Sequence, residues 1–146
     1  MKKTTAIIST AITLMLTAVL FAAEQPVKNA SSHLGTWQLV SAKYGDDKEF
    51  SDAPKDALHL KMLTATHFIW VAYDAKTKVV SSSMGGSYSL EGGNYTETVE
   101  FFLPEPMKAY LGKKQEFTIK IDGDKLTQSG KLSDGMKIEE VWQRVK

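Results

Sequence analysis

Short runs of alternating apolar and polar residues fill the chain from Gly35 onwards, and this period of two is typical of β-strands. Glycine, aspartate and asparagine separate the runs, as expected of turns. No stretch shows an extended helical period, and the sequence predicts only one helical turn, within Pro104–Gly112. The pattern therefore predicts eight strands: Gly35–Tyr44, Ala57–Leu63, His67–Asp74, Met84–Leu90, Asn94–Phe102, Gln115–Asp122, Lys125–Leu132 and Met136–Val145.

Eight consecutive short strands at near-regular spacing favour an all-β fold, an eight-stranded up-and-down antiparallel barrel, over a sandwich. The connections after the second, fourth and sixth strands are tight, whereas those after the first, third and fifth are longer: Gly45–Asp56, Ala75–Ser83 and Leu103–Lys114. One end of the barrel is therefore expected to be a closed floor and the other a rim of loops. If the first and last strands close the barrel, Trp37 and Arg144 should be neighbours at the floor.

Leu34–Val40, Trp142-Gln143-Arg144 and the hairpin of Gly86–Leu90 with Asn94–Glu97 are three motifs that together resemble those of lipocalin-like (calycin-type) barrels, in particular small exported bacterial members of largely unknown function. Leu34–Val40 resembles their Gly-x-Trp opening, and Trp142-Gln143-Arg144 resembles their last strand, in which an arginine lies across the opening tryptophan. The hairpin formed by Gly86–Leu90 and Asn94–Glu97 is similar to a Gly-Ser/Thr-Tyr-x-Leu hairpin of the same group. The resemblance implies a barrel that holds a ligand, and it does not identify that ligand.

The first 23 residues are typical of a secretory signal peptide, because Lys2 and Lys3 precede a charge-free and mostly apolar stretch. An uncleaved membrane anchor is the alternative, since the stretch approaches the ~20 residues that a spanning helix needs. The stretch has no cysteine for lipidation. The sequence thus predicts a signal peptide at 1–23, a tether at 24–33 and a barrel domain at 34–146, with the mature protein in the periplasm or secreted and without a stable membrane anchor.

Composition narrows the classes of function. The chain has no cysteine, which excludes disulfides, thiolate metal sites and a cysteine nucleophile. Loss of Lys2 and Lys3 with the signal leaves 16 basic residues against 17 acidic ones, and the chain has no basic block. Nucleic acid is therefore not an expected partner, and the composition leaves the oligomeric state open.

Pairing across the predicted hairpins places polar groups inside the barrel. Leu90 opposite Tyr95 puts Tyr88 opposite Glu97, and the last hairpin puts Gln128 opposite Glu140. An interior carboxylate must be paired, hydrogen-bonded or protonated. Glu97 is then either a polar contact for a ligand or the partner of Arg144 in an ion pair at the floor, helped by the Tyr88 hydroxyl. Glu140 either faces a cavity, bonds to Gln128, or turns outward if the last strand carries a bulge.

An eight-stranded barrel is just wide enough to be filled by side chains or to hold one small molecule. The leading interpretation is a cavity for a small hydrophobic molecule, since Ala72, Gly86 and Gly130 leave room inside. The loops Gly45–Asp56, with Phe50, and Pro104–Leu111 are expected to form its lid. The predicted ligand-binding residues are Trp70, Tyr88, Phe101, Phe117, Gln128 and Glu140, and the predicted floor residues are Trp37, Glu97, Trp142 and Arg144. The alternative is a filled barrel that acts as a partner-binding or structural protein of the cell envelope.

No metal, cofactor or catalytic residue is expected. If Leu63 opposes His67, His59 opposes Val71, so the two histidines lie on the outer face roughly 13 Å apart, too far for one ion. A single haem ligand is a remote alternative. Two interior carboxylates also raise a distant isomerase or hydrolase alternative, because glycoside hydrolysis uses such a pair. The rest of the chain provides no sugar cleft, so the sequence favours non-catalytic binding.

Overall fold

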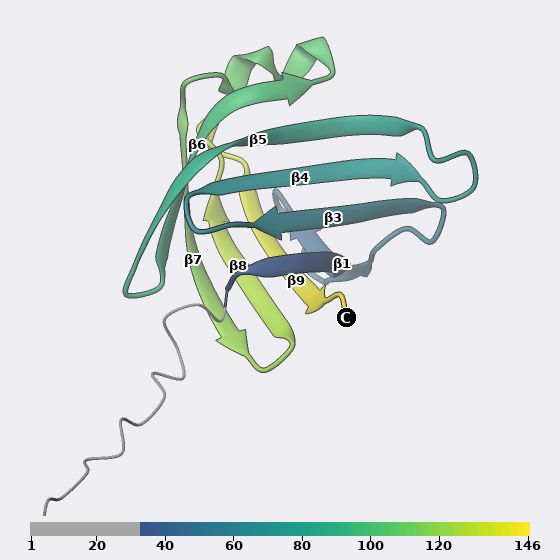
Figure 1. The fold of residues 1–146 in the computed structure, drawn as a ribbon, viewed down its shortest axis with the longest axis horizontal. Helices are drawn as coiled ribbons and strands as arrows, with labels where there is room; N and C mark the ends of the chain where they lie inside the picture. The colour runs from purple at the N-terminus through teal and green to yellow at the C-terminus, as the bar shows by residue number, and fades with distance from the viewer. Residues whose placement is uncertain (1–32) are drawn as a thin grey trace, which may run out of the picture.

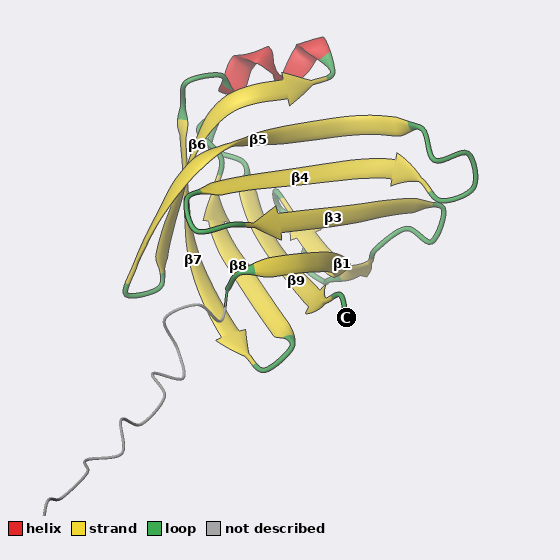
Figure 2. Cartoon of the chain, in the orientation of Figure 1, coloured by secondary structure: helices red, strands yellow, loops and turns green. Residues whose placement is uncertain are grey.

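The computed structural model describes residues 33–146; the predicted signal peptide and all of the predicted tether except His33 lie outside this range. The described residues form nine strands and one 3₁₀ helix (Figure 2). Within them, no helix is long and apolar enough to cross a membrane. The elements are β1 (Gly35–Tyr44), β2 (Ser51–Asp52), β3 (Ala57–Leu63), β4 (His67–Asp74), β5 (Val80–Glu91), β6 (Asn94–Leu103), η1 (Glu105–Tyr110), β7 (Lys114–Asp122), β8 (Lys125–Lys131) and β9 (Lys137–Arg144).

The long strands form one closed antiparallel barrel (Figure 1). From β3 to β9 each strand pairs with the next along the chain, and β1 pairs with both β3 and β9. The two-residue strand β2 only adds to the edge of β1. The prediction of an eight-stranded, up-and-down, lipocalin-like barrel is therefore confirmed, and all eight predicted strands are present with small differences at their ends.

The registers of two hairpins agree with the pairing expected from the sequence. Tyr88 pairs with Glu97 across β5 and β6, and Gln128 pairs with Glu140 across β8 and β9. The tight turns that follow β3, β5 and β7 close one end of the barrel, and η1 lies over the other end (Figure 1).

The register predicted for the hairpin of β3 and β4 is wrong by one residue. Leu63 pairs with Phe68, so His59 pairs with Ala72 rather than with Val71. The cause is the turn, because the Thr64 amide bonds to the His67 carbonyl and leaves only two residues between them. A shift of one residue moves every side chain of a strand to the other face. The inner face of β3 therefore carries His59 and Lys61, and the predicted outward position of His59 is wrong.

The lower half of the barrel, next to the tight turns, is a packed apolar core. Trp37 is fully buried (0% exposed) and pairs with Arg144 across β1 and β9. The Arg144 guanidinium carbon lies 4.1 Å from the centre of the Trp37 ring, a cation–π distance. Arg144 also donates to the Leu34 carbonyl at 2.7 Å and pairs with Asp124 at 3.3 Å. The same core contains Leu39, Leu63, Phe68, Tyr95 and Leu126.

Candidate functional site

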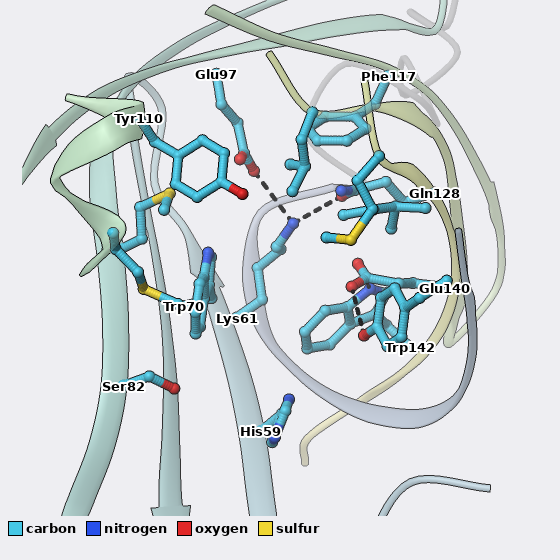
Figure 3. A pocket seen from close by; sticks show the side chains of 16 residues that line it. His59, Lys61, Trp70, Ser82, Glu97, Tyr110, Phe117, Gln128, Glu140 and Trp142 are labelled. Carbon is cyan, nitrogen blue, oxygen red and sulfur yellow. Dashed lines mark hydrogen bonds and ion pairs between the residues drawn. The ribbon is translucent and has the colours of Figure 1, made fainter. Parts of the chain in front are cut away.

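A cavity of about 320 Å³ lies inside the barrel next to η1, in the half of the interior away from the tight turns, here called the upper half (Figure 3). Its volume lies at the lower end of the range typical of small-molecule sites. The walls are mostly apolar, and they consist of Tyr44, Trp70, Met84, Met107, Tyr110, Phe117, Leu132, Met136, Ile138 and Trp142. The polar residues that face the cavity are His59, Lys61, Ser82, Glu97, Gln128 and Glu140.

Lys61 crosses the interior from β3 and is almost completely buried (2% exposed). Its Nζ donates to Glu97 Oε1 on β6 at 3.1 Å and to Gln128 Oε1 on β8 at 2.7 Å (Figure 3). The ammonium also lies 5.2 Å from the centre of the Trp142 ring. A buried charge needs this kind of partnership, because desolvation of an unpaired ammonium is costly. The cluster of Lys61, Glu97 and Gln128, here called the polar layer, separates the packed core from the cavity.

This arrangement excludes one of the two interpretations of Glu97. Its ion pair is with Lys61, whereas Arg144 pairs with Asp124. The alternative of a floor ion pair between Glu97 and Arg144 is therefore wrong. The Tyr95 hydroxyl is buried beside the Glu97 carboxylate without a well-formed hydrogen bond, and burial, with this carboxylate, raises the pKa of Tyr95.

Glu140 is the second carboxylate of the cavity, and it has no bond to Gln128, contrary to one of the predicted alternatives. Its Oε1 accepts a hydrogen bond from the Tyr44 hydroxyl at 3.0 Å, and its Oε2 accepts one from Trp142 Nε1 at 3.1 Å. Burial raises the pKa of Glu140, and the charge of Lys61 opposes this effect only in part. Glu140 is thus a carboxylate that faces the cavity without a cation of its own.

Only one of the two predicted lid segments covers the cavity. Met107 and Tyr110 of η1 line it, and the Tyr110 hydroxyl donates to Asp134 Oδ2 in the turn between β8 and β9 at 2.6 Å. This bond raises the pKa of Tyr110 to about 12 and lowers the pKa of Asp134. The segment Gly45–Asp56 contributes no lining residue, because it folds back along β1, where Phe50 lies over Lys43 on the outer surface.

Four of the six predicted ligand-binding residues line the cavity: Trp70, Phe117, Gln128 and Glu140. The predicted inward position of Phe101 is wrong. Gly86 pairs with Val99 but Gly85 pairs with Phe101, so Glu100 is an extra residue that forms a bulge in β6. The bulge turns Phe101 to the outer face, where it is 48% exposed and covers Gly85.

Tyr88, another of the six, lies at the floor rather than in the cavity wall. Its hydroxyl donates to the Thr64 carbonyl and lies 2.9 Å from His33 Nε2. Its ring contacts that of Tyr95, with the centroids 5.1 Å apart. The predicted placement of Tyr88 in the wall is therefore wrong. Of the predicted floor residues, Glu97 and Trp142 line the cavity from below, while Trp37 and Arg144 lie deeper.

Lys61 and Tyr44 both reach the cavity, although the sequence pattern does not predict either of them as a site residue. A bulge in β1 between Leu39 and Ser41 makes Ala42 and Tyr44 point inward, whereas a strict period of two from Trp37 places them outward.

Gly86 and Gly130, which the sequence predicts to leave room inside the barrel, leave no spare room. A Cβ atom at either position would lie within 2.2 Å of a carbonyl oxygen of the neighbouring strand.

In the part of the chain that the structure describes, the histidines do not cluster with other side chains that could bind a metal ion. His59 faces the cavity singly, and burial lowers its pKa, which favours a neutral ring. His67 is exposed and bonds to Thr66 Oγ1. Within residues 33–146, no group of three histidine, cysteine, aspartate or glutamate side chains is placed to hold a metal ion.

The model of a protein family described as "Domain of unknown function (DUF4488)" matches residues 32–146, and the chain belongs to this family. No curated protein matches the chain. A lipocalin-like protein from Bacteroides uniformis has a similar structure, with a TM-score of 0.54 and 16% identity over 78% of this chain and 99% of that one. An uncharacterized protein from Bacteroides eggerthii has a TM-score of 0.51 and 14% identity over 77% of this chain and 98% of that one.

A redesigned β-barrel is also similar, with a TM-score of 0.50 and 16% identity over 80% of this chain and 94% of that one. At these identities the likeness shows the fold alone. The resemblance to exported lipocalin-like barrels of unknown function, noted from the sequence, is confirmed as regards the fold.

Proposed function

We propose that this member of the DUF4488 family is an exported, non-catalytic binding protein that holds one small, largely apolar molecule inside its barrel. The observation that carries the proposal is the cavity of about 320 Å³ with apolar walls beneath η1. A filled barrel would have side chains in this space, as the lower half does. Pockets with apolar walls and a few polar groups are the usual form of small-molecule sites.

The absence of catalysis is part of the proposal, and the state of the polar groups supports it. Glu97 is tied to Lys61 at 3.1 Å, so it is a poor base or nucleophile. Glu140 already accepts hydrogen bonds from Tyr44 and Trp142. An isomerase or hydrolase that uses the two carboxylates is the distant alternative, and a turnover abolished by both Glu97→Gln and Glu140→Gln would favour it.

Export is likewise proposed, on the basis of Lys2 and Lys3 followed by the uncharged segment that ends at Ala23. The mass of the mature protein, purified from its own organism, tests this part. A chain that begins close to Glu24 in the periplasm or the medium supports export with cleavage. A full-length chain in the cytoplasm contradicts it.

Cavity binding can be tested with N-phenylnaphthylamine, a neutral apolar dye whose fluorescence rises in apolar surroundings. Ser82 faces the cavity, and Ser81 beside it is exposed. Ser82→Trp should fill part of the cavity and abolish the fluorescence increase, whereas the matched control Ser81→Trp should preserve it. Equal binding by both variants would place the dye elsewhere. No binding to the unmodified protein, together with an empty barrel in native mass spectrometry, would favour a filled barrel or an envelope partner protein.

A further inference from the structure

We propose that the molecule held in the cavity carries a positively charged amine, and that Glu140 receives this amine. The inference rests on the proposed binding function and adds the chemical class of the ligand. It follows from the charges that face the cavity and from the partners that each of them already has.

The cavity contains one cationic side chain and two carboxylates: Lys61, Glu97 and Glu140. Its other titratable groups are His59, Tyr44 and Tyr110. Burial favours the neutral form of His59, and the pKa values of both tyrosines are raised, so these three rings carry no compensating charge near neutral pH. Burial raises the pKa of Glu140, and a bound ammonium group would offset this effect by stabilising the ionised form. With both carboxylates ionised, the interior has an excess of one negative charge, which the charge of such a ligand neutralises.

Lys61 is not available to an anionic ligand. Its ammonium is bound by Glu97 at 3.1 Å and by the Gln128 side-chain carbonyl at 2.7 Å, and the face of Trp142 lies 5.2 Å away. A ligand carboxylate that reached Lys61 would have to displace Glu97 or lie beside it. Either outcome leaves a buried carboxylate without a full partner, which is strongly unfavourable. The cavity should therefore reject fatty acids and similar anions.

Glu140 is in the opposite situation. Its two oxygens accept one hydrogen bond each, from Tyr44 and from Trp142, and both donors are neutral. An ionised carboxylate has about four acceptor positions, so two remain for a ligand. The carboxylate extends from β9 toward the interior, and part of the residue's surface is open to the cavity (Figure 3). A ligand ammonium group there would form a charge-assisted hydrogen bond in a site of low dielectric constant.

The apolar and aromatic walls of the cavity suit the uncharged part of such an amine. Trp70 and Tyr44 present aromatic surfaces, which attract cations as well as apolar groups. Met84, Met107 and Met136 are flexible and polarizable, so they can adapt to the shape of an aromatic or aliphatic body. The volume of about 320 Å³ limits the ligand to a compact amine rather than a long chain.

Three probes that share an indole ring separate the effect of ligand charge on affinity from the effect of ligand shape. Tryptamine is cationic, tryptophol is neutral and indoleacetate is anionic. Each is titrated calorimetrically near neutral pH against the unmodified protein, Glu140→Gln and Glu139→Gln. Glu139 is the matched control, because it neighbours Glu140 in β9 but pairs with Lys43 at 2.6 Å on the outer face. We expect tryptamine to bind about tenfold or more tightly than indoleacetate.

Glu140→Gln should weaken tryptamine binding by about tenfold and change tryptophol binding much less, while Glu139→Gln should change neither. Indoleacetate binding as tight as that of tryptamine, or tryptamine binding unaffected by Glu140→Gln, would overturn the inference and leave the proposed function intact. The inference is likewise overturned, and the proposed function is left intact, if the neutral dye binds in the cavity and tryptamine does not. If neither the dye nor any indole binds, the proposed function itself fails.

Discussion

Replacement of Lys61 by methionine tests the energetic role of the ion pair inside the barrel. Both side chains of the pair are nearly inaccessible, with 3% exposure for Lys61 and 4% for Glu97. At their separation of 3.1 Å, and with an effective dielectric constant of about 20, the Coulomb attraction is about 5 kcal/mol. Desolvation costs several kcal/mol for each ion, so the pair as a whole contributes about zero to the free energy of unfolding.

The single and double replacements should therefore differ sharply. Lys61→Met leaves the Glu97 carboxylate buried without its cation and removes the donor to Gln128, and it should destabilise the protein by about 3–5 kcal/mol. Replacement of both charged residues, Lys61→Met with Glu97→Leu, removes the charges together. The double variant should lie within about 1–2 kcal/mol of the unmodified protein.

Equilibrium denaturation in urea measures these differences, with the slope of the transition as a check that unfolding stays two-state. A domain of this size has only about 5–15 kcal/mol of stability, so the single variant can be partly unfolded. The double variant keeps the test decisive in that case, because it must fold. A Lys61→Met variant as stable as the unmodified protein would refute the reasoning, as would a double variant whose loss equals the sum of the two single losses.

Three further predictions concern other parts of the barrel. Arg144→Ala should lower the free energy of unfolding by about 2 kcal/mol, because the guanidinium stacks on Trp37 and bonds to the Leu34 carbonyl. Gly86→Ala should cost about 3 kcal/mol, since its Cβ would lie 2.0 Å from a carbonyl oxygen of β6. Gly92→Ala, at a positive φ in open space, should cost only about 1 kcal/mol. Glu140 has a raised pKa in the fold, so it holds its proton more tightly when folded. The free energy of unfolding of the unmodified protein, taken relative to that of Glu140→Gln, should therefore fall as the pH rises above 4.5, the usual pKa of a glutamate.

Each of these predictions has an outcome that contradicts it. An unchanged melting temperature for Arg144→Ala would show that the stack on Trp37 contributes nothing; the exposed Lys146→Ala is the control for charge at this end of the barrel. Equal losses for the two glycine variants would rule out the close approach at Gly86. A stability difference between the unmodified protein and Glu140→Gln that does not vary with pH would show that the pKa of Glu140 is not raised.

The strands could be predicted from the sequence because a period of two is a local property of the chain. The limits of β1, β3 and β4 agree with the prediction, and so do the registers of the two hairpins on which Glu97 and Glu140 lie. The predicted register of β3 with β4 and the predicted inward position of Phe101 are wrong because a turn or a strand there differs by one residue from the regular pattern. The short turn before His67 and the bulge at Glu100 each reverse the faces of the residues that follow.

The polar layer could not be predicted, because its members come from three strands. Glu97 lies 36 residues from Lys61 along the chain, and Gln128 lies 67 residues from it. An alternating pattern cannot show which strands face one another across a barrel. The alternating pattern also predicts the wrong inner face for β3. Leu60 and Met62 are apolar, yet they lie on the outer face and are only half-buried.

An inward lysine between two outward apolar residues breaks the pattern that governs the other strands, and such departures are expected where function rather than stability determines the residue. The energetics of the polar layer agree with this view, because Lys61 and Glu97 together add about nothing to stability. Their effect is to pair one of the two carboxylates with a cation, which leaves Glu140 as the carboxylate of the cavity without one. The double variant therefore also tests function: because it removes a cation and a carboxylate together, Glu140 remains the carboxylate without a cation, so the preference for tryptamine over indoleacetate should be preserved, and its loss would contradict the role assigned to Glu140.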